Sequence, residues 1–331
     1  MRPKALYVLN ASSYDLIYGP EERAAIAELC EVMAPPQTKE SLAAAPSLLR
    51  EAEVIFSGWG APHMDAAFLA AAPALRAVFY GAGSVKAMVS EALWQRGIVV
   101  TSSWGANGIP VAEFTVAEIV FSLKLGWHYV LAGKREGRLP AKRAVPGLYG
   151  STVGLVSLGM IGRMVAERLR AYEVKVIAYD PFVKAEAAAA LGVELVGLDE
   201  VFARADVVSL HTPWLKETEK MIQGRHFALM KRDATFINTA RGAVVDEAGM
   251  IEVLQERTDL MAVLDVTYPE PPKPGSPLYT LSNVVLTPHI AGSLNQECRR
   301  MGRYAVEECR RYVRGEKLQW QVTEAMAATL A

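Results

Sequence analysis

The chain has 331 residues, of which 51% are hydrophobic and 21% charged, a composition typical of folded globular proteins that excludes long disordered regions. Lys plus Arg number 35 and Asp plus Glu number 36, so the formal net charge is −1 and no basic surplus exists to bind a nucleic-acid backbone. At about 150 residues per domain, this length predicts two domains.

Neither a membrane span nor a cysteine-based site is expected. No uninterrupted apolar stretch reaches about 18 residues, and the N-terminal apolar run that ends at Asn10 is too short for a signal peptide. Cys30, Cys298 and Cys309 lack the spacing of metal or redox motifs. We therefore expect free thiols, no metal site and a cytoplasmic protein.

Short apolar runs alternate with helical segments along the whole chain. Helices are expected between most of these runs, for example at Glu21–Val32, Arg163–Ala171 and Glu247–Gln255. This alternation favours parallel sheets with crossover helices, and the number of runs favours two α/β units. The predicted strands are Ala5–Leu9, Val54–Ser57, Ala77–Tyr80, Val99–Thr101, Thr152–Val156, Lys175–Tyr179, Val207–Leu210, Thr235–Asn238, Met261–Val266 and Val284–Leu286.

Three segments between these runs bear on the domain organisation. Ser102–Pro110 is rich in Ser, Gly, Asn and Pro and predicts the linker at the domain boundary, followed by a long apolar helix from about Val111. Burial of that helix against a partner subunit and burial within the chain are both open. Gly137–Gly150 predicts a loop, and Ala185–Ala190 predicts a helix.

A glycine-rich turn follows the predicted strand Thr152–Val156. It reads SLGMIG, from Ser157 to Gly162, and a helix is expected from Arg163. Gly159 would allow close approach of a pyrophosphate, and Gly162 would allow the helix to pack near the strand. Ser157 occupies the first fingerprint position in place of Gly. Its Cβ could crowd the turn, or its hydroxyl could bond a phosphate.

An acidic residue ends the next predicted strand. Asp180 lies 18 residues after Gly162, where a carboxylate can accept hydrogen bonds from the adenosine ribose. A carboxylate there also repels a 2′-phosphate, so the sequence favours NAD over NADP, with Lys184 as a nearby cation that would soften the preference.

Three polar residues follow later predicted strands, namely Arg241 in FINTARG, Glu270 in DVTYPEP and His289 in LTPHIAG. The carboxyl edge of an open α/β sheet carries the ligand crevice. The planar fork of Arg241 suits a substrate carboxylate, while a Glu beside a His favours the charged imidazole and fixes its orientation. Each residue alone also has a structural explanation. Arg241 could cap a helix or pair with Asp246, Glu270 could be a solvated loop acid, and His289 could be a core histidine.

Together these motifs resemble the D-isomer-specific 2-hydroxyacid dehydrogenases. The resemblance runs from Ser151 to Gly292 and extends less closely to about Gly81. It implies an NAD-binding Rossmann domain at 104–291, inserted into a flavodoxin-like substrate domain at 1–103 plus 292–331. The matching stretches are SLGMIG, AYDP, LHTPWLKETEKMI, ALMKRDATFINTARGAVVDE, LDVTYPEPPKPGSPLY and LTPHIAG.

The resemblance implies hydride transfer between NAD(H) and a small 2-keto or D-2-hydroxy acid. Arg241 would clamp the substrate carboxylate, and His289, paired with Glu270, would be the general acid/base. Besides Arg241 and His289, the implied cofactor residues are Ser157, Gly159, Met160, Ile161, Gly162, Asp180, Pro181, His211, Thr212, Pro213, Thr218, Thr239, Ala240 and Asp265. The implied substrate residues, again besides Arg241 and His289, are Trp59, Gly81, Ala82, Gly83 and Ser84.

The resemblance leaves several points open. An NAD(H)-sensing regulatory protein similar to the C-terminal binding proteins is the alternative function, and Ser157 alone hints at an inactive relative. Trp59 is either an aromatic wall of the substrate site or a core tryptophan. Glyoxylate, hydroxypyruvate, phosphoglycerate-like and bulkier keto acids all stay possible. The family is commonly dimeric through the long helix after the linker and the Gly137–Gly150 loop, so a homodimer is expected.

Overall fold

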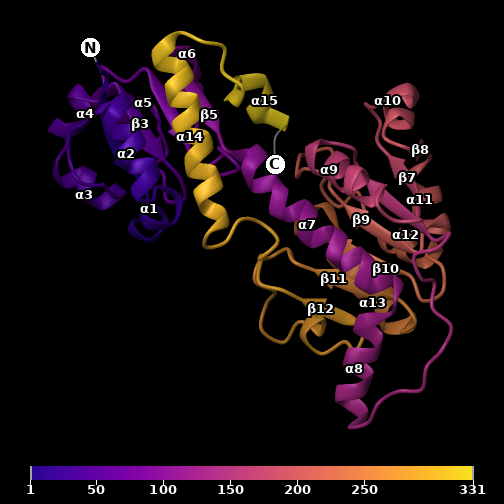
Figure 1. The fold of residues 1–331 in the computed structure, drawn as a ribbon. Coiled ribbons are helices and arrows are strands. Elements are labelled where there is room, and N and C mark those ends of the chain that lie inside the picture. The colour runs from indigo at the N-terminus through magenta and orange to yellow at the C-terminus, as the bar shows by residue number, and fades with distance from the viewer. Residues whose placement is uncertain (1, 330–331) are drawn as a thin grey trace. The chain divides into compact units, whose positions relative to one another are not determined.

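The computed structural model describes residues 2–329 and forms two compact units, each built on its own sheet (Figure 1). The terminal unit combines the chain up to Gly108 with the segment from Ser293 onward, and the central unit is Ile109–Gly292. The chain therefore leaves the first unit, builds the second and returns to the first.

The terminal unit has a six-stranded sheet in the order β13-β5-β4-β3-β1-β2, parallel except for β13. The order of its first five strands is that of flavodoxin-like sheets. Its strands are β1 (Lys4–Val8), β2 (Glu31–Val32), β3 (Val54–Ser57), β4 (Ala77–Tyr80), β5 (Val99–Ser102) and β13 (Gln321–Val322). Its helices are α1 (Ala11–Ile17), α2 (Pro20–Leu29), α3 (Lys39–Ala44), α4 (Ser47–Glu51), α5 (Ala66–Ala71), α6 (Glu91–Gln95), α14 (Glu297–Arg314) and α15 (Glu324–Thr329).

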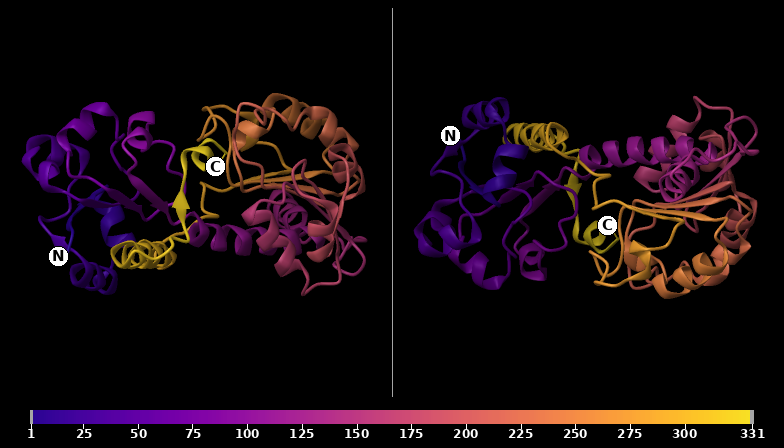
Figure 2. Two further views of the ribbon diagram at one scale, coloured as in Figure 1. Left: turned by 90° about the horizontal axis from the view of Figure 1, so that it is seen from above. Right: turned by 90° about the horizontal axis from the view of Figure 1, so that it is seen from below.

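The central unit has a seven-stranded, entirely parallel sheet in the order β12-β11-β10-β9-β6-β7-β8. Figure 2 shows this sheet with helices on both faces. Its strands are β6 (Thr152–Val156), β7 (Lys175–Tyr179), β8 (Val193–Leu195), β9 (Val207–Leu210), β10 (Thr235–Asn238), β11 (Met261–Leu264) and β12 (Val284–Leu286). Its helices are α7 (Trp104–Leu123, which starts in the terminal unit), α8 (Gly126–Glu136), α9 (Met160–Leu169), α10 (Ala185–Ala190), α11 (Leu198–Arg204), α12 (Gly224–Leu229), α13 (Glu247–Glu256) and the 3₁₀ turns η1 (Gly242–Val244) and η2 (Pro277–Tyr279).

Both sheets are buried on two faces, which explains why their strands read as continuous apolar runs. In β10, Phe236 packs in one core cluster while its neighbour Ile237 packs in the cluster on the opposite face. In β1, Leu6 and Tyr7 divide in the same way. Successive side chains of a strand point to opposite faces, so each strand contributes to two cores. The prediction of two parallel-sheet α/β domains is confirmed.

The two units divide at Gly108, inside the stretch Ser102–Pro110 where a boundary is predicted, but this stretch is helical and the long helix starts earlier than Val111, because α7 already begins at Trp104. The Ser102 hydroxyl accepts a hydrogen bond from the Trp104 N–H at 3.2 Å, and the Ser103 carbonyl accepts one from the Asn107 N–H at 3.0 Å. These bonds start the helix, and Pro110 lies inside it. Gly137–Gly150 contains no helix or strand, as predicted.

Helix α7 is long and apolar enough to cross a membrane by length and composition alone, with a mean hydropathy of 1.2. In the structure 61% of that window is buried. This is weak evidence for a span, because a core helix has the same properties.

Candidate active site

Three neighbouring strands of the central sheet end at the predicted catalytic residues. Strands β10, β11 and β12 lie side by side and are parallel, so their carboxyl ends share one edge. Arg241 follows β10, Glu270 follows β11 and His289 follows β12. The fold therefore brings together three residues that are spread over 49 positions of the sequence.

Glu270 and His289 are in direct contact. His289 Nδ1 lies 2.7 Å from Glu270 Oε1, and the two side chains are 48% and 41% exposed. This bond leaves Nε2 as the ring nitrogen that is able to exchange a proton with a ligand. His289 also has a φ of 55°, in the left-handed region that residues with a side chain rarely adopt. Such outliers cluster at functional sites, where the surrounding structure enforces them.

Asp265 enforces the turn at His289. Its carboxylate accepts hydrogen bonds from the Thr287 hydroxyl at 2.6 Å and from the N–H groups of Ile290 and Ala291 at 2.8 and 2.9 Å. The His289 N–H donates to the Asp265 carbonyl at 3.0 Å. Asp265 is 2% exposed. Because these bonds flank His289 on both sides, Asp265 fixes the backbone from which the imidazole extends.

Arg241 is held by a residue that the sequence did not reveal as important. The Asn238 side chain donates to the Arg241 carbonyl at 3.2 Å and accepts from the Ala240 N–H at 3.0 Å. The Arg241 guanidinium donates to the Ala240 carbonyl at 2.6 Å. Burial lowers the pKa of Arg241 and nearby Glu270 raises it, but the group stays cationic at neutral pH.

The glycine-rich turn has the geometry that a pyrophosphate needs. A Cβ added at Gly159 would meet nothing within 4 Å, so the backbone there faces open space. A Cβ at Gly162 would lie 2.2 Å from the Ser157 carbonyl, so only glycine allows α9 to approach the strand. Met160 and Ile161 form the first turn of α9. The turn therefore fits a dinucleotide.

Ser157 has a φ of 80°, a conformation that suits the glycine it replaces. Its hydroxyl lies 2.8 Å from that of Thr212, which is 3% exposed. The Thr212 hydroxyl also lies 3.4 Å from the Val156 carbonyl. This hydroxyl pair ties the glycine-rich turn to the loop after β9.

The Asp180 carboxylate is partly engaged by backbone groups. One oxygen accepts from the Leu158 N–H at 2.8 Å, and the other accepts from the N–H groups of Phe182 and Val183 at 2.9 and 3.1 Å. A carboxylate has about four acceptor positions, so one is left for a ribose hydroxyl. Pro181, next to it, is exposed.

The loop after β9 contains four further predicted cofactor residues, His211 to Pro213 and Thr218. His211 is bonded to Ser209 through Nε2 at 3.1 Å, and burial lowers the pKa of His211 to about 4. The Thr218 hydroxyl donates to the Pro213 carbonyl at 2.6 Å, so it shapes this loop. After β10, the Thr239 hydroxyl contacts that of Thr115 on α7 at 3.0 Å.

The predicted substrate residues lie at the carboxyl edge of the terminal sheet. Trp59 follows β3 and is 36% exposed, so it is no fully buried core tryptophan. Gly81 to Ser84 follow β4, where the Ser102 hydroxyl lies 2.9 and 2.5 Å from the carbonyls of Ala82 and Gly83. These residues and the His289 pair belong to different units.

A family model described as "D-isomer specific 2-hydroxyacid dehydrogenase, NAD binding domain" matches residues 120–291. The chain is 37% identical over 228 residues to a D-3-phosphoglycerate dehydrogenase of Methanocaldococcus jannaschii, a match that covers 68% of this chain and 43% of the relative. It is 36% identical over 258 residues to a glyoxylate reductase of Korarchaeum cryptofilum, covering 76% and 77%. The chain spans less than half the length of the first of these relatives.

Solved structures show the same fold. The TT0316 protein of Thermus thermophilus is 31% identical, with a TM-score of 0.73 and coverage of 98% of this chain and all of that one. A D-isomer specific 2-hydroxyacid dehydrogenase of Lactobacillus delbrueckii, in its NAD-complexed form, is 23% identical with a TM-score of 0.81, covering 97% and 100%. The predictions of the fold and of NAD as cofactor are confirmed, and the chain belongs to the D-isomer specific 2-hydroxyacid dehydrogenase family.

Proposed function

We propose that this protein is an NAD-dependent dehydrogenase that interconverts 2-keto acids and D-2-hydroxy acids. The observation that carries the proposal is the 2.7 Å contact between Glu270 and His289, which follow the adjacent strands β11 and β12. Strand β11 also adjoins β10, which precedes Arg241. A proton donor, a carboxylate that orients it and a guanidinium share one sheet edge. This set matches what reduction of a 2-keto acid demands of a protein.

In the proposed reaction Arg241 binds the substrate carboxylate through its planar fork and polarises the keto group. The imidazolium of His289 donates the Nε2 proton to the keto oxygen. The Glu270 carboxylate accepts a hydrogen bond from the Nδ1–H and stabilises the charged ring. The neutral ring that results keeps its Nδ1–H, so it is ready to accept a proton from a hydroxy acid in the reverse direction. A positioned acid is typically worth about 10²–10⁴ in rate.

NAD would lie along the glycine-rich turn, with Gly159 facing the pyrophosphate and Asp180 facing the adenosine ribose. When bound, its nicotinamide supplies or accepts the hydride. The Asp180 carboxylate disfavours a 2′-phosphate, which supports a preference for NAD over NADP. Met160, Ile161 and Pro181 flank these two contacts.

We propose the remaining site residues on the resemblance and on their places in the fold. The loop from His211 to Pro213, shaped by Thr218, follows β9, which adjoins the strand before the glycine-rich turn. Thr239–Ala240 follow the next strand, β10, and both segments would lie beneath a nicotinamide. Asp265 would hold the nicotinamide amide in addition to the His289 turn. Gly81 to Ser84 would meet the substrate carboxylate with backbone N–H groups, and the exposed Trp59 would limit the substrate side chain.

NADH oxidation, measured at 340 nm with 2-keto acids from glyoxylate to phenylpyruvate and repeated with NADPH, tests the proposal. Turnover by the wild type that is lost in His289→Ala supports it and ranks the substrates. Bound NADH without turnover of any acid would replace it with an NAD(H)-sensing regulatory protein. A failure to bind NADH would point to Ser157 as the cause.

We also propose a homodimer in which α7, α8 and the loop Gly137–Gly150 meet the partner subunit. Leu139 and Tyr149 in that loop are 91% and 83% exposed, and Phe121 and Val130 on α7 and α8 are 40% and 39% exposed. Apolar side chains so exposed are typical of a subunit contact. Sedimentation of the wild type and of Leu139→Asp tests this proposal, and an unchanged monomer in both samples would overturn it.

A further inference from the structure

We infer that Glu247 is a positioning residue that holds the Glu270 segment against His289. The inference rests on the proposed function, since it assigns to Glu247 the support of the proposed proton donor. Glu247 is the first residue of α13, and the segment in question runs from Thr267 to Glu270 after β11.

The Glu270 segment needs an anchor, because it leaves the sheet and is exposed from Tyr268 onward. The Thr267 hydroxyl donates to the Pro269 carbonyl at 2.9 Å, but this bond is internal to the segment. A bond to another element comes from Glu247, whose Oε2 accepts from the Tyr268 N–H at 3.3 Å. Tyr268 is two residues before Glu270, so the bond lies close to the carboxylate that it would place.

Packing beneath this bond supports the same role. The segment crosses η1 so closely that a Cβ on Gly242 would lie 2.0 Å from the Thr267 carbonyl carbon. Arg241 directly precedes Gly242, so the turn that presents Arg241 and the segment that presents Glu270 are pressed together. The Glu247 side chain bonds the Tyr268 N–H, one residue beyond the Thr267 contact with Gly242.

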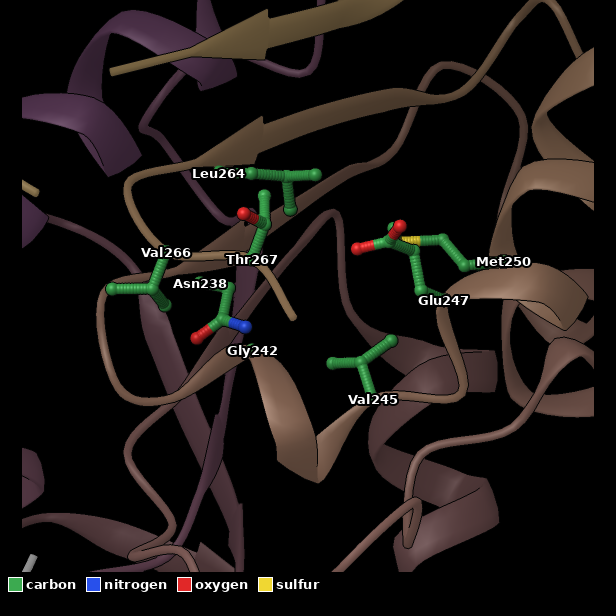
Figure 3. Close-up of a pocket in the computed structure, with 8 residues that line it drawn as sticks. All are labelled: Asn238, Gly242, Val245, Glu247, Met250, Leu264, Val266 and Thr267. Atoms are coloured by element: carbon green, nitrogen blue, oxygen red, sulfur yellow. The ribbon is translucent and has the colours of Figure 1, made fainter. Parts of the chain in front are cut away.

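A small cavity separates the Glu247 side chain from the contact between η1 and the segment. Figure 3 shows the carboxylate directed toward Thr267, with Asn238 and Gly242 on the far side. The cavity is about 10 Å³, the room needed by one water molecule. Burial raises the pKa of Glu247, and the Tyr268 N–H opposes that shift. The Glu247 side chain is therefore partly buried rather than fully solvated.

The competing explanation is a purely structural one, in which Glu247 stabilises the positive end of α13. The two explanations differ in what glutamine does. Gln keeps an oxygen that accepts from the Tyr268 N–H, but it loses the charge that the helix end would attract. Positioning therefore survives in Glu247→Gln, whereas a purely electrostatic role does not.

The kinetic test compares Glu247→Ala, Glu247→Gln and the control Glu252→Ala, which removes an exposed acid from the same helix. The substrate is whichever of glyoxylate, pyruvate, hydroxypyruvate and phenylpyruvate the wild type reduces fastest. We expect kcat to fall about 10- to 100-fold in Glu247→Ala, because misplacement by about 1 Å has effects of that size. The KM for NADH should stay within about twofold, and Gln should restore most of kcat. Equal losses in Ala and Gln, or none, would overturn the inference.

A second measurement keeps the inference testable even if no keto acid is reduced. The Nδ1 proton of His289 gives an imidazole NMR signal that is assigned by its absence in His289→Ala. We expect Glu247→Ala to move or broaden this signal, and Gln and the Glu252 control to leave it in place. An unchanged signal in Glu247→Ala would overturn the positioning role whether or not the wild type is active. Failure of the wild type to reduce any keto acid, with the signal shifted as expected, would overturn the proposed function alone.

Discussion

Ser157 gives the sharpest test of how this chain differs from a glycine-rich fingerprint. Its φ of 80° would be free of strain for glycine but costs a residue with a Cβ about 1–2 kcal/mol. Ser157→Ala keeps that strain and loses the 2.8 Å bond to Thr212, which is worth about 1 kcal/mol. Ser157→Gly loses the same bond and releases the strain.

The difference between the two variants isolates the strain. Glycine also gives the unfolded chain more conformational entropy, which lowers stability by about 0.4–1 kcal/mol and offsets part of the released strain. The free energy of unfolding should therefore be about 0.5–1 kcal/mol higher for the Gly variant than for the Ala variant. For a unit of this size that corresponds to roughly 1–4 °C in Tm, which differential scanning calorimetry resolves. An Ala variant that melts at or above the Gly variant would refute the strain argument.

Cofactor binding by the same two proteins tests why the serine is present. If its hydroxyl donates to a pyrophosphate oxygen, both variants lose one charge-assisted hydrogen bond of about 1.5–3 kcal/mol. The Kd for NADH, measured by fluorescence titration, should then rise about 10- to 100-fold in both. A Kd that stays at the wild-type value in both variants would exclude a phosphate contact, and a tighter Kd in Gly alone would show that the Cβ crowds the turn.

Three further changes have expected outcomes. Arg241→Lys should lower kcat/KM for the best keto acid by at least about tenfold, because an ammonium does not reproduce the planar fork, and unchanged kinetics would remove Arg241 from the clamp. Gly242→Ala should lower the unfolding free energy by about 2 kcal/mol or more in urea denaturation, because its Cβ would overlap the Thr267 backbone; a change below about 0.5 kcal/mol would contradict this packing. Burial lowers the pKa of His211 in the folded chain from the ordinary 6.5 to about 4. The contribution of this group to stability is therefore fully present at pH values above 6.5 and is lost as the pH falls toward 4. Because His211 is partly exposed, we expect this loss to be about 1–2 kcal/mol. The melting temperature should therefore depend less on pH between 4 and 6.5 in His211→Asn than in the wild type, and an equal dependence in both proteins would contradict this.

The long central strands were predictable because both faces of each sheet are covered. Such strands have continuous apolar runs, and β3, β4, β6, β7, β9 and β10 have the predicted bounds. The edge strands β2, β8 and β13 were missed, because each has only two or three residues and one of them is polar, whereas the three-residue edge strand β12 is entirely apolar and was predicted. They exist because a neighbouring strand offers hydrogen bonds, which is a tertiary effect.

The proposed catalytic residues were easier to predict than the residues that support them. Arg241, Glu270 and His289 each follow a recognisable strand, so topology alone places them at one edge. Asn238 and Glu247 act through hydrogen bonds to backbone groups of other loops, and those partners exist only after the loops have packed. The sulfur atoms of Cys30 and Cys309 likewise come within 3.6 Å although 279 positions separate them, which spacing rules do not detect.

The two strained loops of the central unit show how such support works. Ser157 and His289 both adopt a positive φ, which costs on the order of 1–3 kcal/mol each. At His289, three hydrogen bonds to the buried Asp265 carboxylate offset that cost, since bonds to a charged group contribute about 1.5–3 kcal/mol each. At Ser157 the hydroxyl pairs with that of Thr212, and the next residue, Leu158, donates its N–H to the Asp180 carboxylate. The turn at His289 therefore has three hydrogen bonds to a carboxylate, and the glycine-rich turn has one. A proton donor must stay aligned with one oxygen atom, whereas a turn that binds a flexible pyrophosphate tolerates adjustment when its ligand arrives.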